Sequence, residues 1–493
     1  MAEYKKFAKD VGVIGIAELV LALRGLFLIP IIAKTLGASG YGIWAQVVVT
    51  LKFIAPIASL VLSFTFVRFF AGQRDKKKIQ EGFFSIFVTI FFWSSFIALI
   101  MFFLATPIAS IIFKDPNATG IVKITAILIP FSNINTLFLF FFRTFRQMKT
   151  YSALMITQNF GEIALVFYLV QSGYGIFGAV TSLLIINVLM DLIMLGLIMS
   201  QIGIKIPRFS NMRSYLKFGL PLIPSNFAHW ITDWSDRYVI VLFIGMGSVG
   251  IYSAAYRIGS IILLFITPLN LVMVPALSKS YDEGKIEEVK NLLSYSLKYL
   301  LLLIIPSAFG LSILGKSILR IMTKPEFVSS GALIIPFVAM SMVLFSVYEV
   351  IWQVINLVKK TKTIGMIWGF AALTNLGLNI IFVPLIGILG AAITTLIAFA
   401  MITSLAAFYS LKWLKFEIDW QFILKSVAAS IVMSLIIRLI FPTQTLSTFL
   451  CVGVGIVVYV AVLFLLKGFT REEMRFFRDI FRRITKIKGQ SEP

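Results

Sequence analysis

One apolar stretch of this chain, residues 218–243, carries six side chains that could do chemistry inside a membrane. In order along the chain they are His229, Trp230, Asp233, Trp234, Asp236 and Arg237. The four ionisable ones follow spacings of i, i+4, i+7 and i+8, so a helix places them on one face, with the tryptophans on an adjacent stripe. An ionisable group within hydrocarbon costs about 2.5–3.5 kcal/mol on insertion scales and usually faces an interior cavity. This stretch is therefore expected to line a binding site.

Four basic residues lie deep within predicted membrane helices: Arg24, Lys52, Arg237 and Arg257. In a dry core, four uncompensated positive charges would repel one another, so a water-filled cavity that receives an anion is the better explanation. The four occur in helices that correspond between the two halves of the chain. Pro56 and Pro268 predict kinks in two of these helices. Paired interruptions of this kind point to a site between the halves.

The acidic residues and the histidine admit two interpretations. Asp233, Asp236, Glu18 and His229 could couple transport to H⁺ or Na⁺. Alternatively, a structural ion pair between Asp233 and Arg237 locks the helix and His229 is a hydrogen-bonded packing residue. The two tryptophans are likewise either platforms for a bound sugar or packing and interfacial anchors. Both interpretations stay open at the level of sequence.

Catalytic, metal and cofactor chemistry find no support in the sequence. The chain has one His and one Cys, so a metal site or a catalytic triad is hard to build. Residues 310–317 match the phosphate-loop pattern GxxxxGK[ST], but they end a predicted membrane helix instead of joining a strand to a helix. We predict a protein that is not an enzyme and that binds no metal or cofactor.

The composition requires a membrane. Hydrophobic residues make up 59% of the 493 residues and charged residues 13%, and a soluble protein of this size could not cover that much apolar surface. A membrane helix needs about 20 apolar residues. Fourteen such stretches occur, near residues 11–33, 41–67, 83–105, 121–142, 153–170, 176–200, 218–243, 249–273, 292–314, 328–357, 364–383, 388–411, 422–441 and 446–466. The predicted fold is an all-α integral membrane protein with 14 transmembrane helices.

The two halves of the chain repeat each other. AILIPF at residues 126–131 matches ALIIPF at 332–337, and GIFGAVTSLLI from Gly175 matches GILGAAITTLI from Gly387. Each repeat holds six stretches, an even number, so both enter the membrane in the same direction and form parallel pseudo-repeats. The predicted units are an N-terminal six-helix lobe (1–205), a C-terminal six-helix lobe (206–411), two further helices (412–467) and a basic amphipathic tail (468–493).

The distribution of basic residues predicts the orientation. Most of the 44 Lys and Arg residues fall in loops that are cytoplasmic if the N-terminus is inside, which places both termini in the cytoplasm and the protein in the cell (inner) membrane. A surface facing anionic lipids therefore explains the net charge of +22 better than binding to nucleic acid does. Residues 469–488 are expected to form an amphipathic helix along the inner membrane surface.

Three segments carry a family resemblance: Arg24 followed by LGASGYGIW (36–44), DRYVIVLFIGMGSVGIYSAAYRI (236–258) and GILGAAITT from Gly387. They resemble the polysaccharide flippases of the multidrug/oligosaccharidyl-lipid/polysaccharide exporter superfamily. The resemblance implies two six-helix lobes forming a V, with helices 1, 2, 7 and 8 lining a central cationic cavity. The four basic residues map onto those helices.

The resemblance implies a flippase that moves a polyprenyl-diphosphate-linked oligosaccharide from the inner to the outer leaflet by alternating access. Anionic lipids, and a glycan polymerase or other assembly proteins, are the expected partners besides the substrate. The alternatives are a cation-coupled multidrug exporter, a peptidoglycan-precursor flippase of the same superfamily and a polytopic glycan polymerase. A polymerase would need acid–base groups on sizeable outer loops, whose only carboxylates here are Asp115 and Glu326.

Overall fold

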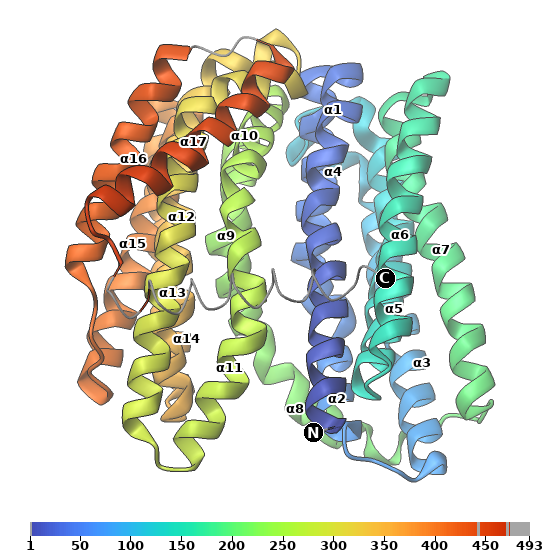
Figure 1. The fold of residues 1–493 in the computed structure, drawn as a ribbon. Helices are drawn as coiled ribbons and strands as arrows, with labels where there is room; N and C mark the ends of the chain where they lie inside the picture. Colours follow the sequence, from blue (N-terminus) through green and yellow to red (C-terminus); the bar gives the residue numbers. More distant parts are fainter. Residues whose placement is uncertain (1, 441–443, 470–472, 474–493) are drawn as a thin grey trace, which may run out of the picture.

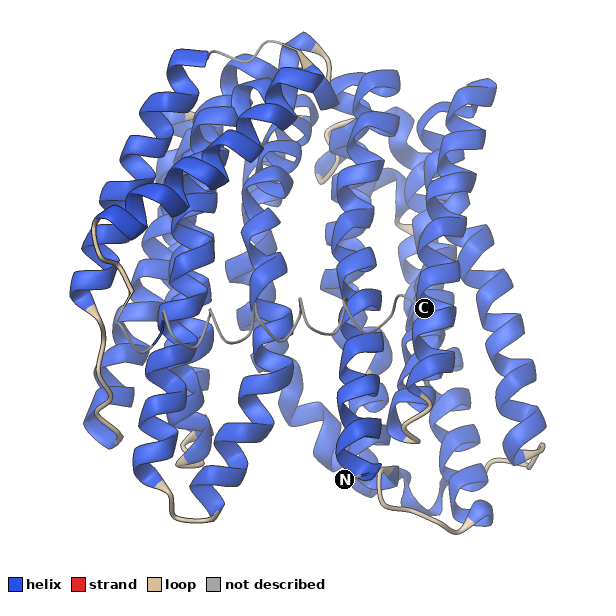
Figure 2. Ribbon diagram, in the orientation of Figure 1, coloured by secondary structure: helices blue, strands red, loops and turns tan. Residues whose placement is uncertain are grey.

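The computed structural model describes the backbone of residues 2–440, 444–469 and 473, and the side chains of those from Arg24 onward. The predicted surface helix at 469–488 and most of the predicted tail at 468–493 therefore lie outside the described residues, as does the side chain of Glu18. About 90% of the described residues are helical, and these residues contain no strand (Figure 2).

The helices follow one another with short connections. In the first half they are α1 (Ala2–Ser59), α2 (Leu62–Phe70), α3 (Lys76–Phe103), α4 (Ala105–Ile111), α5 (Thr119–Thr144), α6 (Met148–Leu169) and α7 (Gly175–Ile202). They continue with α8 (Met212–Gly219), α9 (Ile223–Phe243), α10 (Met246–Gly259), α11 (Ile266–Asp282), α12 (Ile286–Met322), α13 (Val328–Leu357), α14 (Thr361–Ile386), α15 (Ile388–Trp413), α16 (Trp420–Ile440) and α17 (Thr445–Leu465).

Among the described residues, 11 helical segments are long and apolar enough to cross a membrane. Two of them contain glycines in the left-handed region, where only glycine is free of strain: Gly37 (φ 73°) within α1, and Gly173 (φ 89°) just before α7. The chain turns at Gly37, because α1 begins at the lower end of Figure 1 and the next helix, α2, lies at that same end. The charged helix α9 is not among the 11 segments.

Three predicted helices are interrupted where the sequence contains proline. The stretch 41–67 breaks four and five residues after Pro56, where Leu60 and Val61 take positive φ values. The stretch 249–273 is divided by the 3₁₀ segment Ser260–Phe265, shortly before Pro268. The stretch 218–243 begins late, because a 3₁₀ turn containing Pro221 separates α8 from α9.

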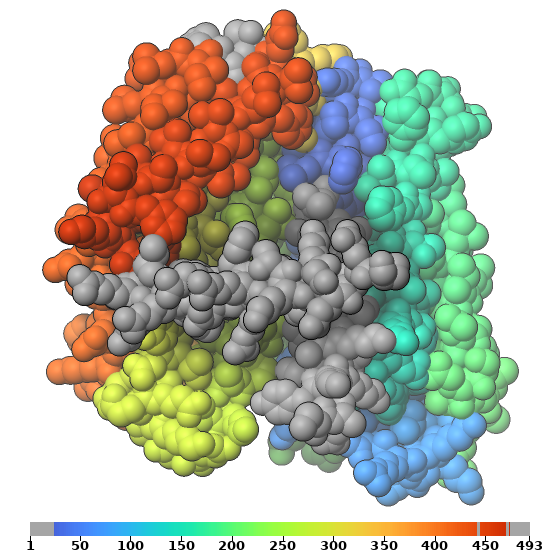
Figure 3. Space-filling view, in the orientation of Figure 1, coloured from blue at the N-terminus to red at the C-terminus, as the bar shows by residue number. Residues whose placement is uncertain are grey.

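The helices form two groups. Figure 1 shows α1–α7 on one side of the view and α9–α15 on the other, with α16 and α17 outermost beside α12, and Figure 3 shows the same division on the surface. The groups meet where α1 packs against α10. There the backbones nearly touch: a Cβ on Gly42 would lie 2.0 Å from the carbonyl oxygen of Met246, and one on Gly250 would lie 1.9 Å from that of Ala38. Only glycine permits this approach.

The segment that connects the two groups of helices, between α7 and α8, is bound to α3 of the first group. Glu81 at the start of α3 pairs with Lys205 at 2.7 Å and with Arg208 at 3.8 Å, and Ser85 donates a hydrogen bond to the backbone carbonyl of Arg208 at 2.8 Å. Tyr215 of α8 then packs against the ring of Phe69, 5.0 Å away. Residues 205–215 therefore belong structurally with the first group of helices.

Lys298 ties α12 to two later segments. Its ammonium lies 3.0 Å from a carboxylate oxygen of Asp419, just before α16, and 3.0 Å from one of Glu473. Burial raises the pKa of Asp419, but the N–H of Phe422 and the Lys298 ammonium outweigh it and hold that pKa below its ordinary value. A carboxyl group whose pKa is lowered by folding stabilises the folded state fully at pH values above its ordinary pKa. This stabilisation is lost as the pH falls through the lowered pKa, so the contribution of Asp419 is complete at neutral pH.

We expect Lys298→Met to destabilise the purified protein by on the order of 3 kcal/mol, because it removes the ammonium that pairs with both the buried Glu473 carboxylate and that of Asp419. The figure is at the low end for a buried pair, since Asp419 is partly exposed. The measurement is the midpoint of thermal unfolding in detergent. Lys290→Met is the matched control, because Lys290 pairs with the exposed Glu287 on the same helix. Equal midpoints for the two variants would contradict the role of Lys298.

Candidate functional site

A cavity of about 280 Å³ lies where α1, α9 and α10 meet α13 and α15. Its lining includes all four of the deep basic residues that the sequence singled out: Arg24, Lys52, Arg237 and Arg257. Aromatic side chains supply much of the remaining wall, namely Tyr41, Trp44, Trp234, Tyr256, Phe345 and Phe399. The structure therefore gathers positive charge, contributed by both groups of helices, around one space.

Arg24 is held by an acidic residue on a neighbouring helix. Its Nη1 donates to Glu162 of α6 at 2.6 Å, and the Glu162 side chain is only 2% exposed. The Arg24 side chain is 30% exposed, so it can face the cavity while it stays paired. The expectation that the four basic residues are uncompensated is therefore wrong for Arg24.

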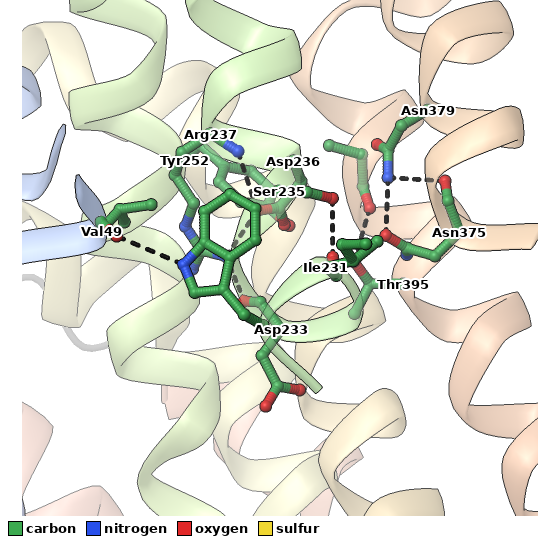
Figure 4. Close-up of polar contacts among 12 residues, drawn as sticks. Val49, Ile231, Asp233, Ser235, Asp236, Arg237, Tyr252, Asn375, Asn379 and Thr395 are labelled. Carbon is green, nitrogen blue, oxygen red and sulfur yellow. Dashed lines mark hydrogen bonds and ion pairs between the residues drawn. The ribbon is translucent and has the colours of Figure 1, made fainter. Parts of the chain in front are cut away.

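Arg237 is also paired, and more deeply buried. Nη1 lies 2.6 Å from Asp236 Oδ1 and donates to the backbone carbonyl of Asp233 at 2.7 Å. The second oxygen of Asp236 accepts a hydrogen bond from the Tyr252 hydroxyl. Figure 4 shows Arg237, Asp236 and Tyr252 converging between α9 and α10. The guanidinium also lies 4.2 Å from the ring of Tyr256, a favourable cation–π distance. Asp236 is therefore the fixed counter-ion of Arg237.

Lys52 and Asp233 are the less constrained charges of the cavity. The ammonium of Lys52 lies 4.1 Å from the centre of the Trp234 ring and makes no hydrogen bond or ion pair among the described residues. Asp233 is the one carboxylate in the cavity lining, and its carboxylate likewise has no such partner among the described residues. In Figure 4 this carboxylate points away from Asp236. These two groups can respond to a ligand without breaking an existing pair.

The position of the Arg257 guanidinium requires a glycine, Gly25, on the opposite side of the cavity. A Cβ on Gly25 would lie 2.1 Å from Arg257 Nε and 2.4 Å from Nη2, inside the guanidinium. The guanidinium thus lies directly against the backbone of α1, one residue beyond Arg24. A small residue at position 25 is required to bring two arginines from different groups of helices to the same place.

Three of the described site residues predicted from the sequence lie outside the cavity lining: Asp236, which pairs with Arg237, and also Trp230 and His229. The Trp230 indole donates to the backbone carbonyl of Val49 at 3.2 Å and packs 4.7 Å from the Phe53 ring. The ring centre of His229 lies 3.8 Å from that of Trp368 on α14, with the two rings tilted by 40°. These contacts favour the packing interpretation for Trp230 and His229, whereas Trp234 stays in the cavity wall.

A separate polar cluster lies behind α9. Thr394 donates to Asn379 Oδ1 at 2.9 Å, and Asn379 donates to Asn375 Oδ1 at 3.0 Å; all three residues are fully buried. Figure 4 shows Asn375 and Asn379 on the opposite side of α9 from Val49. Reasoning from the sequence missed this cluster, and it also missed Glu162 as the partner of Arg24. An acidic or amide residue within an apolar helix was the available signal, but the partners lie up to 138 positions apart.

The fold and the site together define an all-helical membrane protein with a basic cavity between two groups of helices. Residues 7–281 match the family of polysaccharide biosynthesis proteins, and residues 221–381 match the MatE family. Because the first match covers more than half of the chain, this protein belongs to the polysaccharide biosynthesis protein family.

Two curated relatives come from Haloferax volcanii. The probable low-salt glycan biosynthesis flippase Agl15 is 26% identical over 273 residues, covering 54% of this chain and 57% of that protein. The probable flippase AglR is 31% identical over 179 residues, covering 35% and 37%. The chain thus spans about half the length, or less, of these relatives. Both relatives are named as probable flippases.

Solved structures share the fold at low sequence identity. The lipid II flippase MurJ in an inward closed conformation gives a TM-score of 0.76 at 20% identity, covering 94% of this chain and 99% of MurJ. An inward-facing multidrug resistance MATE transporter gives 0.66 at 14% identity, covering 80% and 94%, and an outward-facing one gives 0.56 at 13%, covering 82% and 95%. The predicted all-α membrane fold is therefore confirmed, whereas the 14 transmembrane helices and the two pseudo-repeats stay predictions.

We expect Gly25→Ala to weaken the binding of inorganic pyrophosphate roughly tenfold, because the added methyl group displaces the Arg257 guanidinium. The measurement is the rise in thermal midpoint that pyrophosphate produces in the purified protein. Gly247→Ala in α10 is the control, because its Cβ would meet only a side-chain atom 4.0 Å away. An unchanged pyrophosphate response in Gly25→Ala would contradict this account of Arg257.

Replacing the two aspartates of α9 by asparagine is expected to have different effects on the stability of the protein. Asp236→Asn leaves the buried Arg237 without its counter-ion and should cost about 3–5 kcal/mol. Asp233→Asn should leave the free energy of unfolding, measured by thermal unfolding in detergent, within about 0.5 kcal/mol of that of the parent protein, because that carboxylate has no hydrogen-bond or ion-pair partner to lose among the described residues. A large loss of stability in Asp233→Asn would assign Asp233 a structural role.

Proposed function

We propose that this protein is a flippase that moves a polyprenyl-diphosphate-linked oligosaccharide from the cytoplasmic to the outer leaflet of the cell membrane. The observation that carries the proposal is the convergence of Arg24, Lys52, Arg237 and Arg257 on one cavity. A diphosphate is the part of such a substrate that needs positive charge, and arginine can bind phosphate oxygens through two parallel hydrogen bonds. The names of the two Haloferax relatives support the same class of activity.

The proposed topology has 14 transmembrane helices arranged as two parallel six-helix lobes and one additional pair. It is supported by the 11 apolar segments, by the breaks at Gly37 and Gly173 that divide two of them, and by the charged helix α9 as a further crossing. Both termini lie on the cytoplasmic side, so the Gly37 turn faces outward. Anionic lipids of the inner leaflet and the proteins that assemble the glycan are the proposed partners.

The charge balance of the cavity favours an anionic headgroup. Its four basic residues are opposed by three carboxylates, Glu162, Asp236 and Asp233, and four minus three leaves one net positive charge. A bound diphosphate with roughly two negative charges would reverse that sign. Uptake of H⁺ or Na⁺ at Asp233 would restore balance, so Asp233 is the proposed coupling residue, whereas Asp236 holds Arg237. The side chain of Glu18 remains a candidate on sequence grounds.

The alternatives are less well supported. A multidrug exporter for organic cations fits the MatE match but not a cavity whose net charge is positive. A glycan polymerase would need free carboxylates outside, yet Asp115 accepts a hydrogen bond from the backbone of Asn117 and Glu326 accepts one from that of Ala38. A peptidoglycan-precursor flippase, as suggested by the fold of MurJ, would use the same diphosphate chemistry with another glycan.

The membrane potential supplies a sufficient driving force. An anionic headgroup gains about 2.3 kcal/mol per charge per 100 mV when it moves to the positive side, so a diphosphate with roughly two charges gains on the order of 4–5 kcal/mol. At 1.4 kcal/mol per factor of ten, this corresponds to an equilibrium ratio of roughly a thousandfold or more. The proposed transport therefore requires no nucleotide.

The test uses proteoliposomes that contain the full chain, a polyprenyl-diphosphate-linked oligosaccharide and an imposed potassium diffusion potential. The substrate should accumulate in the leaflet on the positive side, measured as glycan accessible to an impermeant glycosidase. Lys52→Ala and Arg257→Ala should each slow this movement roughly tenfold to a hundredfold, since a hydrogen bond to a charged group contributes about 1.5–3 kcal/mol. Lys52 is the cleaner probe, because its removal leaves no buried carboxylate unpaired.

Lys290→Ala, far from the cavity on α12, serves as the control for protein quality. Normal transport by the Ala variants of all four cavity residues would refute the cationic cavity as the substrate site. A distribution that ignores the potential would refute the proposed driving force and favour ion coupling at Asp233.

A further inference from the structure

A short turn from the other group of helices forms hydrogen bonds on both sides of the break in α1 at Gly37. This turn, residues 323–327, joins α12 to α13 and contains the 3₁₀ segment Pro325–Phe327. Figure 1 shows the top of α1 and the upper ends of α12 and α13 at the same end of the molecule. About 290 positions in sequence separate the two sides of this contact, which are joined by hydrogen bonds at Ala38 and Thr35.

Glu326 caps the helix that starts after the break. The backbone N–H of Ala38 donates to Glu326 Oε1 at 2.7 Å. Ala38 is the first residue after Gly37, so its N–H belongs to the N-terminal end of the second part of α1, where no preceding carbonyl is available within the helix. A carboxylate at that position satisfies the N–H and lies at the positive end of the helix dipole.

Lys324 contacts the helix that ends before the break. Its Nζ donates to the backbone carbonyl of Thr35 at 3.2 Å. This carbonyl lies in the last turn of the first part of α1, the negative end of its dipole, where a cation is favourable. Lys324 and Glu326 thus place opposite charges on opposite helix ends, two residues apart in one turn.

The two groups of helices also approach each other closely at this end of the molecule. Gly42 and Gly250 allow near contact of the α1 and α10 backbones, and Tyr41 packs edge-on against Phe327, with ring centres 6.3 Å apart. Tyr41 also belongs to the cavity lining. The turn at 323–327, the α1–α10 crossing and the cavity wall at Tyr41 are therefore in continuous contact at the Gly37 end.

We propose that Lys324 and Glu326 form a latch that holds the two groups of helices together at the Gly37 end and must release whenever the cavity opens there. The proposal rests on the proposed function only for its orientation, in which this end faces outward. Glu326 and Thr35 are exposed, so water can replace the latch contacts on opening at little cost. This distinguishes the latch from the buried Arg237–Asp236 pair, whose separation would strand a charge in the core.

The latch is tested by the accessibility of the cavity from outside. Val48 lines the cavity and is half-buried, so Val48→Cys in a Cys451→Ser background provides a reporter for an impermeant maleimide applied to the outer face of intact cells. Glu326→Ala and Lys324→Met should each raise the labelling rate roughly twofold to fivefold, and the double variant roughly tenfold, because each removes one charge from a helix end.

Asp115→Ala is the matched control, because Asp115 is also an outer-loop carboxylate but caps a turn within its own group of helices. Unchanged labelling in the double variant, or an equal rise in Asp115→Ala, overturns the latch. If Glu326→Ala lowers the thermal midpoint, the Glu326→Gln variant is the test of the latch. Its amide oxygen still accepts the hydrogen bond from the Ala38 N–H but carries no charge. Its labelling rate should therefore lie between those of the parent protein and the Lys324→Met variant. Increased labelling together with absent lipid transport would refute the flippase and leave the latch standing.

Discussion

The cost of placing charge inside a membrane governs the organisation of this protein. A charged side chain at the bilayer centre is costly even by the mildest scales, and it persists only beside a partner or facing water. Arg24 has Glu162, Arg237 has Asp236, and Lys52 has the face of Trp234. The two ion pairs hold the guanidinium groups of Arg24 and Arg237 in place, whereas Lys52, with only the ring of Trp234 beside it, is less constrained.

The backbone geometry follows from the same requirement. Arg24 and Arg257 come from different groups of helices and can share one cavity only if α1 offers no side chain at Gly25. The α1 and α10 backbones approach each other closely at Gly42 and Gly250, where a side chain would clash with the opposite backbone. These glycines therefore determine how near the two sets of charges lie, and the aromatic wall of Tyr41, Trp234 and Tyr256 fills the space between them.

The helical membrane fold and the cations of the cavity could be predicted from the sequence, because a membrane requires long apolar stretches and makes each charge within them conspicuous. Apolar length identified the helices, and a basic residue within an apolar stretch identified each of the four cations that line the cavity. The pairing partners could not be predicted, since helix periodicity says which face a residue occupies and not which helix lies opposite. Glu162 was visible as an acid in an apolar helix, but nothing local linked it to Arg24. Likewise, Trp230 and Trp234 share a stripe, yet only the packing of Phe53 and Val49 directs Trp230 away from the cavity.

The charged contacts divide into two kinds, and the division has a mechanical reason. A pair such as Arg237–Asp236, nearly inaccessible to water, cannot separate without stranding a charge, so it moves as part of a rigid body. Contacts that must break and re-form can be charged only where water substitutes for the lost partner, which is the situation of Glu326. Helix ends suit such contacts well, because their partial charges attract a side chain strongly enough to favour one arrangement and weakly enough to release it. The break at Gly37 creates two helix ends at the point where the groups meet, and so provides a reversible contact without burying another ion pair.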